Sequence, residues 1–359
     1  MKEESQKEKI LLVSSIFPPE IGGPSMYVAH LFEEFKNLGY EVYTATYTKD
    51  TACVSFSGGS FLRMLRLFFY LVFHQKKYDV VITFNAFSTG LPCACASKFL
   101  RTKKWIVRVG GDYLWERSGE MSTLSEYYQK SKSFKEKVLI HLLQFSLQSF
   151  DKVIATETMY SKILMEKYSV LQDKLEVIKN PFPIVKRSEK DRKNFYLFAG
   201  RLVALKNPII LLKVIEQFDQ VVLKILGSGP LKSQLTSWVK EHNLESRISI
   251  SESVSQEELF DIMAQARAVI IPSFSEVSPN TLLEALALGT PVICTQETGY
   301  RDEYANVVSF FDPKNINQLV RAIEMHEDPN MYKDIVKKVN DVHTDYSFSD
   351  VASKFVNML

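Results

Sequence analysis

Short apolar runs alternate with amphipathic stretches along most of the chain. In the first half, the runs predict strands at residues 10–15, 41–47, 79–84, 104–109, 151–156 and 175–178. Stretches with helical spacing of apolar residues lie between them, at 25–38, 61–74, 134–149 and 159–168. Strands that alternate with helices favour a parallel sheet covered by helices on both faces.

The pattern breaks at residues 180–194, where prolines and a run of charges predict a linker. It then resumes, with strands predicted at 195–200, 221–226, 247–251, 268–273, 291–295 and 307–311. We therefore expect an α/β protein with two doubly wound parallel-sheet domains, at residues 1–184 and 185–345, facing across a cleft. A last amphipathic helix, at 346–359, is expected to pack back on the first domain. Ligands of such sheets bind beyond the carboxyl ends of the strands.

The segment 270–302 carries the most informative chemistry of the chain. An apolar strand leads into a loop that holds Glu276, and Ser278 and Pro279 are residue types preferred at a helix cap and first helical position. Glu284 is the one charged residue in the helix that follows, and a buried carboxylate is costly unless a donor bonds it. No basic residue is near it in sequence, so a polar ligand such as a sugar hydroxyl is a reasonable partner.

Two basic residues precede another predicted helix start. Arg201 and Lys206 follow the strand at 195–200, and Asn207 and Pro208 suit a helix cap and first position. Cations at that place oppose the helix dipole. A bound diphosphate would remove the conflict, because arginine and lysine together suit its charge. The alternative is that both are ordinary solvated surface charges.

Glu276 and Glu284 lie on either side of a helix start whose free N–H groups can bind an anion. One ligand could therefore contact both carboxylates and a phosphate-binding helix end. An acid and nucleophile pair of the glycosidase type fits less well, because those carboxylates must flank the scissile bond. The alternative for Glu276 alone is an ordinary exposed loop acid.

Two glycine-rich turns follow predicted strands. Gly22 and Gly23 let backbone N–H groups approach a ligand closely, although their spacing is not that of a nicotinamide-binding fingerprint. Gly227 and Gly229 permit a tight turn from strand to helix. Each pair is equally compatible with a plain turn.

Asp112 follows the strand at 104–109, where it would face the cleft and contact substrate hydroxyls or act on the leaving group. A turn aspartate is equally compatible with its position. The six histidines are scattered and form no ligand pair, so we expect no metal site.

Composition narrows the function further. A net charge of +2 over 359 residues does not suggest a nucleic-acid partner. The four cysteines lack metal-ligand spacing, and the first residues hold no apolar signal core, so free thiols and a cytoplasmic location are expected. Residues 61–77 are read either as a core helix of the first domain or as a helix lying on a membrane. The second reading places Arg63, Arg66, Lys76 and Lys77 at the lipid headgroups.

The chain resembles the retaining glycosyltransferases of family 4, which have the GT-B fold. The resemblance covers most of the sequence and is strongest at E-x7-E, formed by Glu276 and Glu284 inside PS-x-x-E…EALA-x-G-TPV. The element GRL-x-x-x-K, with Arg201 and Lys206, supports it. So do GGP, which begins at Gly22, and G-x-G-P, which begins at Gly227. Together their order and spacing are specific.

The resemblance implies a nucleotide-diphosphate sugar as donor, with UDP or GDP as the nucleotide, held mainly by the second domain. Arg201 and Lys206 would bind the diphosphate, Glu284 the ribose hydroxyls and Glu276 the sugar. The implied catalytic residues are Glu276, Asp112, Arg201 and Lys206. Further donor contacts are implied at Gly22, Gly23, Gly200, Gly227, Gly229, Ser253, Val254, Ser278, Pro279, Asn280, Thr281 and Leu282.

The acceptor implied by the resemblance is a glycan or a lipid-linked sugar near Asp112, as in polysaccharide biosynthesis. Transfer would retain the anomeric configuration and use neither a metal nor a cofactor. A peripheral contact with the inner membrane face is expected from the membrane reading of residues 61–77 and stays open beside the core-helix reading. The chain departs from the family pattern at Val277, Ser278 and Glu252, where glycine is common, and at Gly110–Asp112, where many members have histidine. A nucleotide-sugar epimerase or phosphorylase on the same fold, and a non-catalytic binder of sugar nucleotides, remain alternatives.

Overall fold

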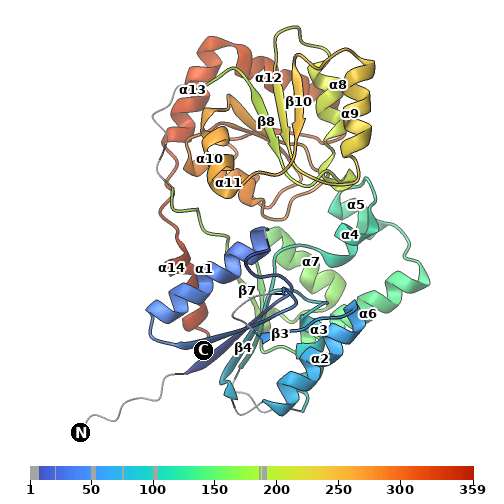
Figure 1. Cartoon of the computed structure of the whole chain (residues 1–359), viewed down its shortest axis with the longest axis vertical. Coiled ribbons are helices and arrows are strands. Elements are labelled where there is room, and N and C mark those ends of the chain that lie inside the picture. The colour runs from blue at the N-terminus through green and yellow to red at the C-terminus, as the bar shows by residue number, and fades with distance from the viewer. Residues whose placement is uncertain are drawn as a thin grey trace. The chain divides into compact units, whose positions relative to one another are not determined.

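The computed structural model describes residues 8–20, 22–49, 54–74, 77–99, 104–185, 187 and 192–359. Contacts between residues divide the chain into two compact units (Figure 1). Unit 1 comprises Met1–Leu114, Lys132–Pro181 and Phe348–Leu359. Unit 2 comprises Trp115–Ser131 and Phe182–Ser347.

Unit 1 contains a seven-stranded parallel sheet of order β3-β2-β1-β4-β5-β6-β7. Its strands are β1 (Lys9–Ser14), β2 (Glu41–Thr46), β3 (Val54–Ser55), β4 (Val80–Thr83), β5 (Lys104–Val109), β6 (Lys152–Ala155) and β7 (Leu175–Val177). Continuous apolar runs suit strands that are buried on both faces, and Ile10, Leu11, Leu12 and Val13 are all fully buried. The strands predicted in the first half are confirmed; β3, with two residues, was not predicted.

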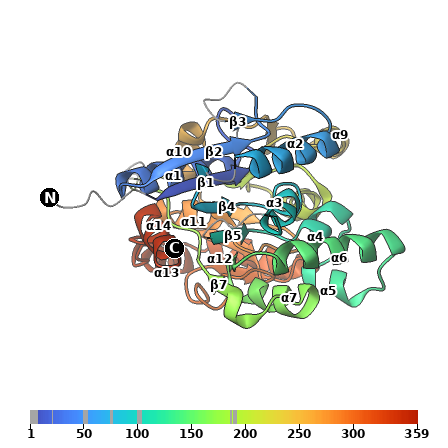
Figure 2. The same cartoon turned by 90° about the horizontal axis from the view of Figure 1, so that it is seen from below.

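Helices cover both faces of this sheet. They are α1 (Gly23–Asn37), α2 (Ser60–Phe73), α3 (Gly90–Ser97), α6 (Phe134–Gln148), α7 (Thr158–Tyr168) and α14 (Phe348–Val356), with the short 3₁₀ helix η2 (Gln172–Lys174). Helix α4 (Tyr113–Ser118) begins at the end of the Met1–Leu114 stretch of unit 1 and continues into unit 2. Figure 2 shows α2, α3 and α6 side by side, with α1 and α14 on the other side of the strands. The last helix packs on α1 through the ring pairs Tyr27–Phe348 and Phe35–Phe355.

Helix α2 differs from the prediction of a core helix, because only one of its sides is buried. Leu67 and Leu71 are covered, whereas Phe61 and Phe73 on the outer side are 75% and 77% exposed. Lys76, which the membrane reading included, lies outside the described residues. Within the ranges that the structure describes, no helix combines the length and the apolarity needed to traverse a bilayer.

Unit 2 contains a six-stranded parallel sheet of order β10-β9-β8-β11-β12-β13. Its strands are β8 (Tyr196–Ala199), β9 (Leu223–Leu226), β10 (Ile248–Ser251), β11 (Ala268–Ile271), β12 (Val292–Thr295) and β13 (Ser309–Phe311). Val269 and Ile271 enter one hydrophobic core and Ala268 and Ile270 the other, as the alternation of side chains along a strand requires. Both faces of the sheet are therefore buried, and the strands predicted in the second half are confirmed.

The helices of unit 2 lie between and after these strands. They are α5 (Leu124–Gln129), α8 (Ile209–Ile215), α9 (Lys232–Glu241), α10 (Gln256–Gln265), α11 (Asn280–Ala287), α12 (Ile316–Glu327) and α13 (Pro329–Asn340), with the 3₁₀ turn η3 (Ala204–Lys206). In each sheet the first strand lies centrally, and the chain winds first to one side of it and then to the other. The order reverses between β1 and β4 in unit 1 and between β8 and β11 in unit 2. Such switch points bind ligands in doubly wound folds.

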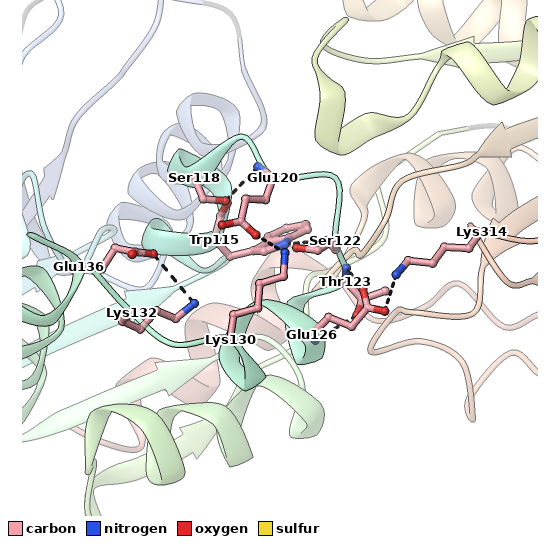
Figure 3. A network of polar contacts seen from close by, with 10 residues as sticks. All are labelled: Trp115, Ser118, Glu120, Ser122, Thr123, Glu126, Lys130, Lys132, Glu136 and Lys314. Carbon is pink, nitrogen blue, oxygen red and sulfur yellow. Dashed lines mark hydrogen bonds and ion pairs between the residues drawn. The ribbon is translucent and has the colours of Figure 1, made fainter. Parts of the chain in front are cut away.

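Unit 2 also includes a segment from the first half of the chain, Trp115–Ser131, which holds most of α4 and all of α5. Thr123 and Glu126 form a reciprocal capping box at the start of α5. The Leu124 N–H donates to Ser275 Oγ at 2.9 Å, and Lys314 donates to Glu126. Figure 3 shows Glu126 between Thr123 and Lys314. These contacts join the segment to loops of the unit 2 sheet.

Candidate functional site

The loops after β8, β11 and β12 meet at the carboxyl edge of the unit 2 sheet. The Phe274 N–H donates to Leu205 O at 3.0 Å, which joins the loop after β11 to the loop after β8. The Glu276 N–H donates to Glu297 O at 2.8 Å, and Glu276 forms an isolated parallel bridge with Thr298. Glu276 is therefore held by its backbone between two neighbouring loops.

Lys206 and Glu276, two of the residues predicted to bind the donor, are in contact. Lys206 Nζ donates to Glu276 Oε1 at 2.5 Å, and Ser273 Oγ donates to the same oxygen at 2.5 Å. Glu276 is only 9% exposed, so it is not the exposed loop acid of the alternative reading. A carboxylate so far removed from water needs such partners.

Arg201 lies on the same loop as Lys206 but is far more open to solvent. Its side chain is 70% exposed, and Nη2 lies 3.9 Å from Glu116 Oε2 of the Trp115–Ser131 segment. An ion pair this exposed contributes little to stability. Arg201 is therefore available for contact with a ligand at little energetic cost.

The turn after β9 is shaped by glycine. The Gly200 N–H donates to Leu226 O at 3.0 Å and the Leu202 N–H to Ser228 O at 2.9 Å. A Cβ atom on Gly227 would lie 1.9 Å from Gly200 O, and one on Gly229 would lie 2.5 Å from Leu202 O. Only glycine therefore lets the turn at 227–229 approach the loop that carries Arg201.

Helix α11 begins at Asn280, and Pro279 rather than Ser278 occupies the cap position, without a side-chain cap hydrogen bond. The prediction of Ser278 as cap and Pro279 as first residue is wrong by one position. Proline is tolerated at this cap position because it has no N–H that the helix end would leave unsatisfied. The Leu282 N–H donates to Pro279 O at 3.2 Å, so that group is already engaged. An anion at this helix end would meet the N–H groups before Leu282.

Glu284 is the unpartnered carboxylate of the site. It lies in the middle of α11, and burial raises its pKa to about 7. Among the residues that the structure describes, no donor lies within hydrogen-bond distance of its side chain, and Leu288 bonds only its backbone oxygen. The site therefore holds a carboxyl group whose hydrogen-bonding capacity is unused by the protein.

The turn that follows Lys206 also differs from the prediction. Asn207 has a left-handed conformation with φ 49° and its Nδ2 donates to Pro313 O at 3.3 Å, whereas α8 begins at Ile209 with Pro208 at the cap position. Asn207 is thus not a helix cap. Asparagine tolerates this conformation better than most residues, and it ends the 3₁₀ turn that carries Lys206.

The loop after β10 contains a second carboxylate that is held by side chains. Glu252 pairs with Lys232, and Ser228 Oγ donates to Glu252 Oε2 at 2.5 Å. These hydrogen bonds, the one from Lys232 first, lower the pKa of Glu252. Ser253 follows directly, with its Oγ 3.4 Å from Ser228 Oγ. Sequence reasoning did not single out Lys232 or Ser228, because neither belongs to a recognisable motif.

Three of the residues predicted to bind or act on the substrate, Gly22, Gly23 and Asp112, belong to unit 1. Gly22 occupies the cap position of α1 and Gly23 is its first residue. Asp112 is fully buried, and its Oδ2 accepts hydrogen bonds from Tyr168 at 2.9 Å and Tyr160 at 3.5 Å. The carboxylate thus has protein partners, and its contact with a substrate stays a prediction.

No group of three or more histidine, cysteine, aspartate or glutamate side chains in the described part of the chain could hold a metal ion. Cys93, Cys95 and Cys294 are free thiols, and Cys53 lies outside the described residues. His326 is fully buried, away from the loops that carry the site, with Nδ1 against Ala322 O at 2.7 Å.

Two protein families match this chain. The model of Glycosyltransferase Family 4 matches residues 21–185, and that of Glycosyl transferases group 1 matches residues 182–341. A relative from Saccharomyces cerevisiae, the phosphatidylinositol N-acetylglucosaminyltransferase GPI3 subunit, is 21% identical over 384 aligned residues, which cover 97% of this chain and 82% of the relative.

Solved structures resemble the whole chain. Sucrose-phosphate synthase from Thermosynechococcus elongatus has a TM-score of 0.77 at 18% identity, with 98% of each chain covered. Anabaena Alr3699/HepE, solved in complex with UDP-glucose, has a TM-score of 0.78 at 16% identity, with 98% of this chain and 100% of that chain covered. At these identities the likeness shows the shared fold.

Proposed function

Since this chain belongs to the family 4 glycosyltransferases and has the GT-B fold, we propose that it is a retaining enzyme that uses a nucleotide-diphosphate sugar. The observation that carries the proposal is the contact of Lys206 with Glu276 at the switch point of unit 2. Glu284, which has no donor among the described residues, lies on α11, the next helix along the chain. A ligand with an anionic centre and hydroxyl groups on two sides matches this set of side chains.

The diphosphate is assigned to Lys206, Arg201 and the start of α11. Departure of the nucleotide builds negative charge on the diphosphate, and cations already in place stabilise that charge as it develops. Lys206 is held by the 3₁₀ turn and by Glu276, so it is pre-positioned. Arg201 is exposed, and its planar guanidinium can bind two phosphate oxygens at once.

Glu276 is assigned to the donor sugar. Its Oε1 is engaged by Lys206 and Ser273. An ionised carboxylate has further lone pairs on both oxygens, so it can accept a sugar hydroxyl while Lys206 stays in place. Ser273 keeps one hydrogen bond to the carboxylate and so fixes its orientation. The buried acid is then never left without a donor, which would be costly.

Glu284 is assigned to the ribose. Two neighbouring hydroxyl groups can donate to the two oxygens of one carboxylate. Because no described protein group bonds the half-buried Glu284 carboxylate, its two oxygens are available to the hydroxyl groups of a nucleoside. UDP is the first nucleotide to test, since Anabaena Alr3699/HepE was solved with UDP-glucose.

A glycan or a lipid-linked sugar is the proposed acceptor class. The Saccharomyces cerevisiae relative is named for transfer of N-acetylglucosamine to phosphatidylinositol, which is a lipid acceptor. The proposed reaction retains the anomeric configuration, with the departing phosphate taking the acceptor proton. It requires no metal ion, because Lys206, Arg201 and helix N–H groups supply the positive charge.

The proposal is tested first by donor binding. UDP-, GDP-, ADP- and dTDP-sugars are compared by thermal shift, because a ligand that binds only the native state raises the melting temperature. The nucleotide that binds is then used in transfer assays with lipid-linked and glycan acceptors, with and without a chelator. NMR of the product reports the anomeric configuration.

Matched variants separate the site from general effects. Lys206→Ala should abolish transfer, whereas Lys213→Ala, which removes an exposed lysine from α8, should not. Transfer that is unchanged in Lys206→Ala would overturn the assignment. An inverted product, or activity that depends on a metal, would overturn the proposed mechanism while leaving the donor assignment standing. An epimerised sugar without transfer would favour the epimerase alternative.

A further inference from the structure

Helix α2 presents a stripe of large apolar side chains to solvent. Residues at intervals of four lie on one side of a helix. Phe61, Leu65, Phe69 and Phe73 follow that interval and are 75%, 37%, 50% and 77% exposed, and Leu62 beside them is 44% exposed. We call these five residues the α2 stripe. Soluble proteins seldom expose so much contiguous apolar surface unless it binds another protein, a ligand or a membrane.

Helix α6 presents a second stripe. Phe134, Val138, Leu142 and Phe145 recur at intervals of three or four and are 82%, 44%, 36% and 41% exposed. The opposite side of α6 is buried in unit 1. We call these four residues the α6 stripe. Two helices of the same layer therefore both turn apolar sides away from the core.

Helix α3 lies between α2 and α6, and aromatic contacts connect the two stripes at its end (Figure 2). On α2, Phe69 stacks on Phe73 with centroids 6.3 Å apart and meets Phe68 at 5.2 Å. Phe68 meets Phe99, which is 72% exposed just beyond α3, at 6.1 Å. Lys98, next to Phe99, places its ammonium 5.9 Å from the ring of Phe145 on α6. The stripes thus belong to one continuous surface.

The charges on these helices are mostly positive. Helix α2 carries Arg63 and Arg66 and no acidic residue, and Lys135 and Lys137 are exposed beside the α6 stripe. Arg63 rests over the ring of Tyr47, whereas Arg66 is exposed and donates from Nη1 to Ser57 O at 2.6 Å. The acidic residue of α6 is Glu136, whose carboxylate accepts from the Ser133 N–H and hydroxyl.

We propose that the α2 and α6 stripes dock on the surface of an anionic lipid bilayer, with Arg66, Lys98, Lys135 and Lys137 at the headgroups. Helices with an apolar side and basic flanks bind in the interface of a bilayer, and each basic residue near an anionic surface adds to the attraction. A second copy of the chain fits less well, because the positive charges on the two copies would repel each other across the interface. The proposal does not depend on the transfer reaction.

The full chain is tested by sedimentation with vesicles of phosphatidylglycerol mixed with phosphatidylcholine, and with vesicles of phosphatidylcholine alone. We expect binding to the anionic vesicles that weakens as salt is raised. Phe61→Ser with Phe73→Ser should weaken it by about tenfold or more, from the apolar area lost. Lys135→Glu with Lys137→Glu should weaken it by about fivefold or more for each lysine.

The matched control is Met325→Ser with Met331→Ser, which removes two apolar side chains of unit 2 that are 43% and 50% exposed. This control should bind vesicles like the unchanged chain. All variants should keep the melting temperature of the unchanged chain, which shows that they are folded. Failure to bind anionic vesicles, or equal binding by the stripe variants, would overturn the proposal. Dimers in light scattering that the phenylalanine variant abolishes, without vesicle binding, would assign the surface to a second copy.

Discussion

Lys206 and Glu276 are 70 positions apart in the chain and are joined by a hydrogen bond of 2.5 Å between Nζ and Oε1. They come from the loops after β8 and β11, the two strands on either side of the switch point. The side chain of Glu276 is 11% exposed and that of Lys206 is 29% exposed, so the lysine is the partner that solvent and ligands reach more easily.

Removal of one partner should cost more stability than removal of both. Lys206→Ala leaves Glu276 with fewer donors in a poorly solvated place, and we expect a loss of about 1–3 kcal/mol in the free energy of unfolding. Glu276→Ala added to it should restore part of that loss, although transfer stays abolished. Urea unfolding of the two single variants and the double variant measures the coupling. If the loss in the double variant equals the sum of the losses in the two single variants, the contact contributes nothing to stability.

Gly227 should tolerate no side chain. A Cβ atom there would lie 1.9 Å from Gly200 O, so Gly227→Ala must displace the loop that carries Arg201. We expect a loss of about 2–4 kcal/mol in the free energy of unfolding and weaker donor binding. Gly200→Ala is the matched control, since its Cβ would meet only the Phe198 ring at 3.7 Å. Equal losses in the two variants would contradict the steric argument.

Donor affinity should rise with pH through the range in which Glu284 titrates. Burial raises the pKa of Glu284 to about 7, and hydroxyl groups that donate to it favour the ionised form. Binding therefore lowers that pKa, and affinity should increase by about tenfold for each unit by which it falls. Calorimetry with the nucleotide sugar at several pH values measures this. Glu284→Gln should give a flat profile, whereas Glu245→Gln, at an exposed position, should keep the slope.

Stability should decline on the acid side because of His326. Burial lowers the pKa of His326 to about 4, and its Nε2 has no partner among the described residues. In the unfolded chain the pKa of His326 is 6.5, so above pH 6.5 both states leave the imidazole neutral and its burial costs no stability. As pH falls from 6.5 toward 4, the unfolded chain binds a proton that the native chain does not, and the free energy of unfolding declines. The loss amounts to roughly 3 kcal/mol. Thermal unfolding of His326→Leu over this range should show a shallower decline; an unchanged slope would contradict the assignment.

Most strands could be predicted from sequence because they contain short apolar runs, and those at the centre of each sheet, such as β1 and β11, are buried on both faces. The two residues of β3 are too few to form a pattern. Helix α3 was not predicted, since the run GLPCACAS has no polar side to produce a helical period. Helix α2 has large apolar side chains on both its buried and its exposed sides, with Arg63 and Arg66 among them, and periodicity then cannot distinguish a buried helix from one whose outer side faces solvent.

The site was predictable as a set of residue types but not as a geometry. Glu284 stood out as one charge in an apolar helix, and the structure describes it without a donor. The contact of Lys206 with Glu276 depends on which strands are neighbours, and no local pattern gives that order. The pairing of Lys232 with Glu252 is of the same kind. The exact cap positions at Pro279 and Pro208 depend on backbone angles that residue preferences leave open by one position.

The path of the chain passes from one unit to the other after Leu114, Ser131, Pro181 and Ser347. A gene cut at the linker would therefore express two fragments that each lack a piece of their own unit: the first would miss Phe348–Leu359 and carry Trp115–Ser131 without its partners. Chimeras that exchange the halves of two related enzymes would need to move these two short pieces as well. The residues inserted into unit 2 then travel with that unit, although they are encoded in the first half.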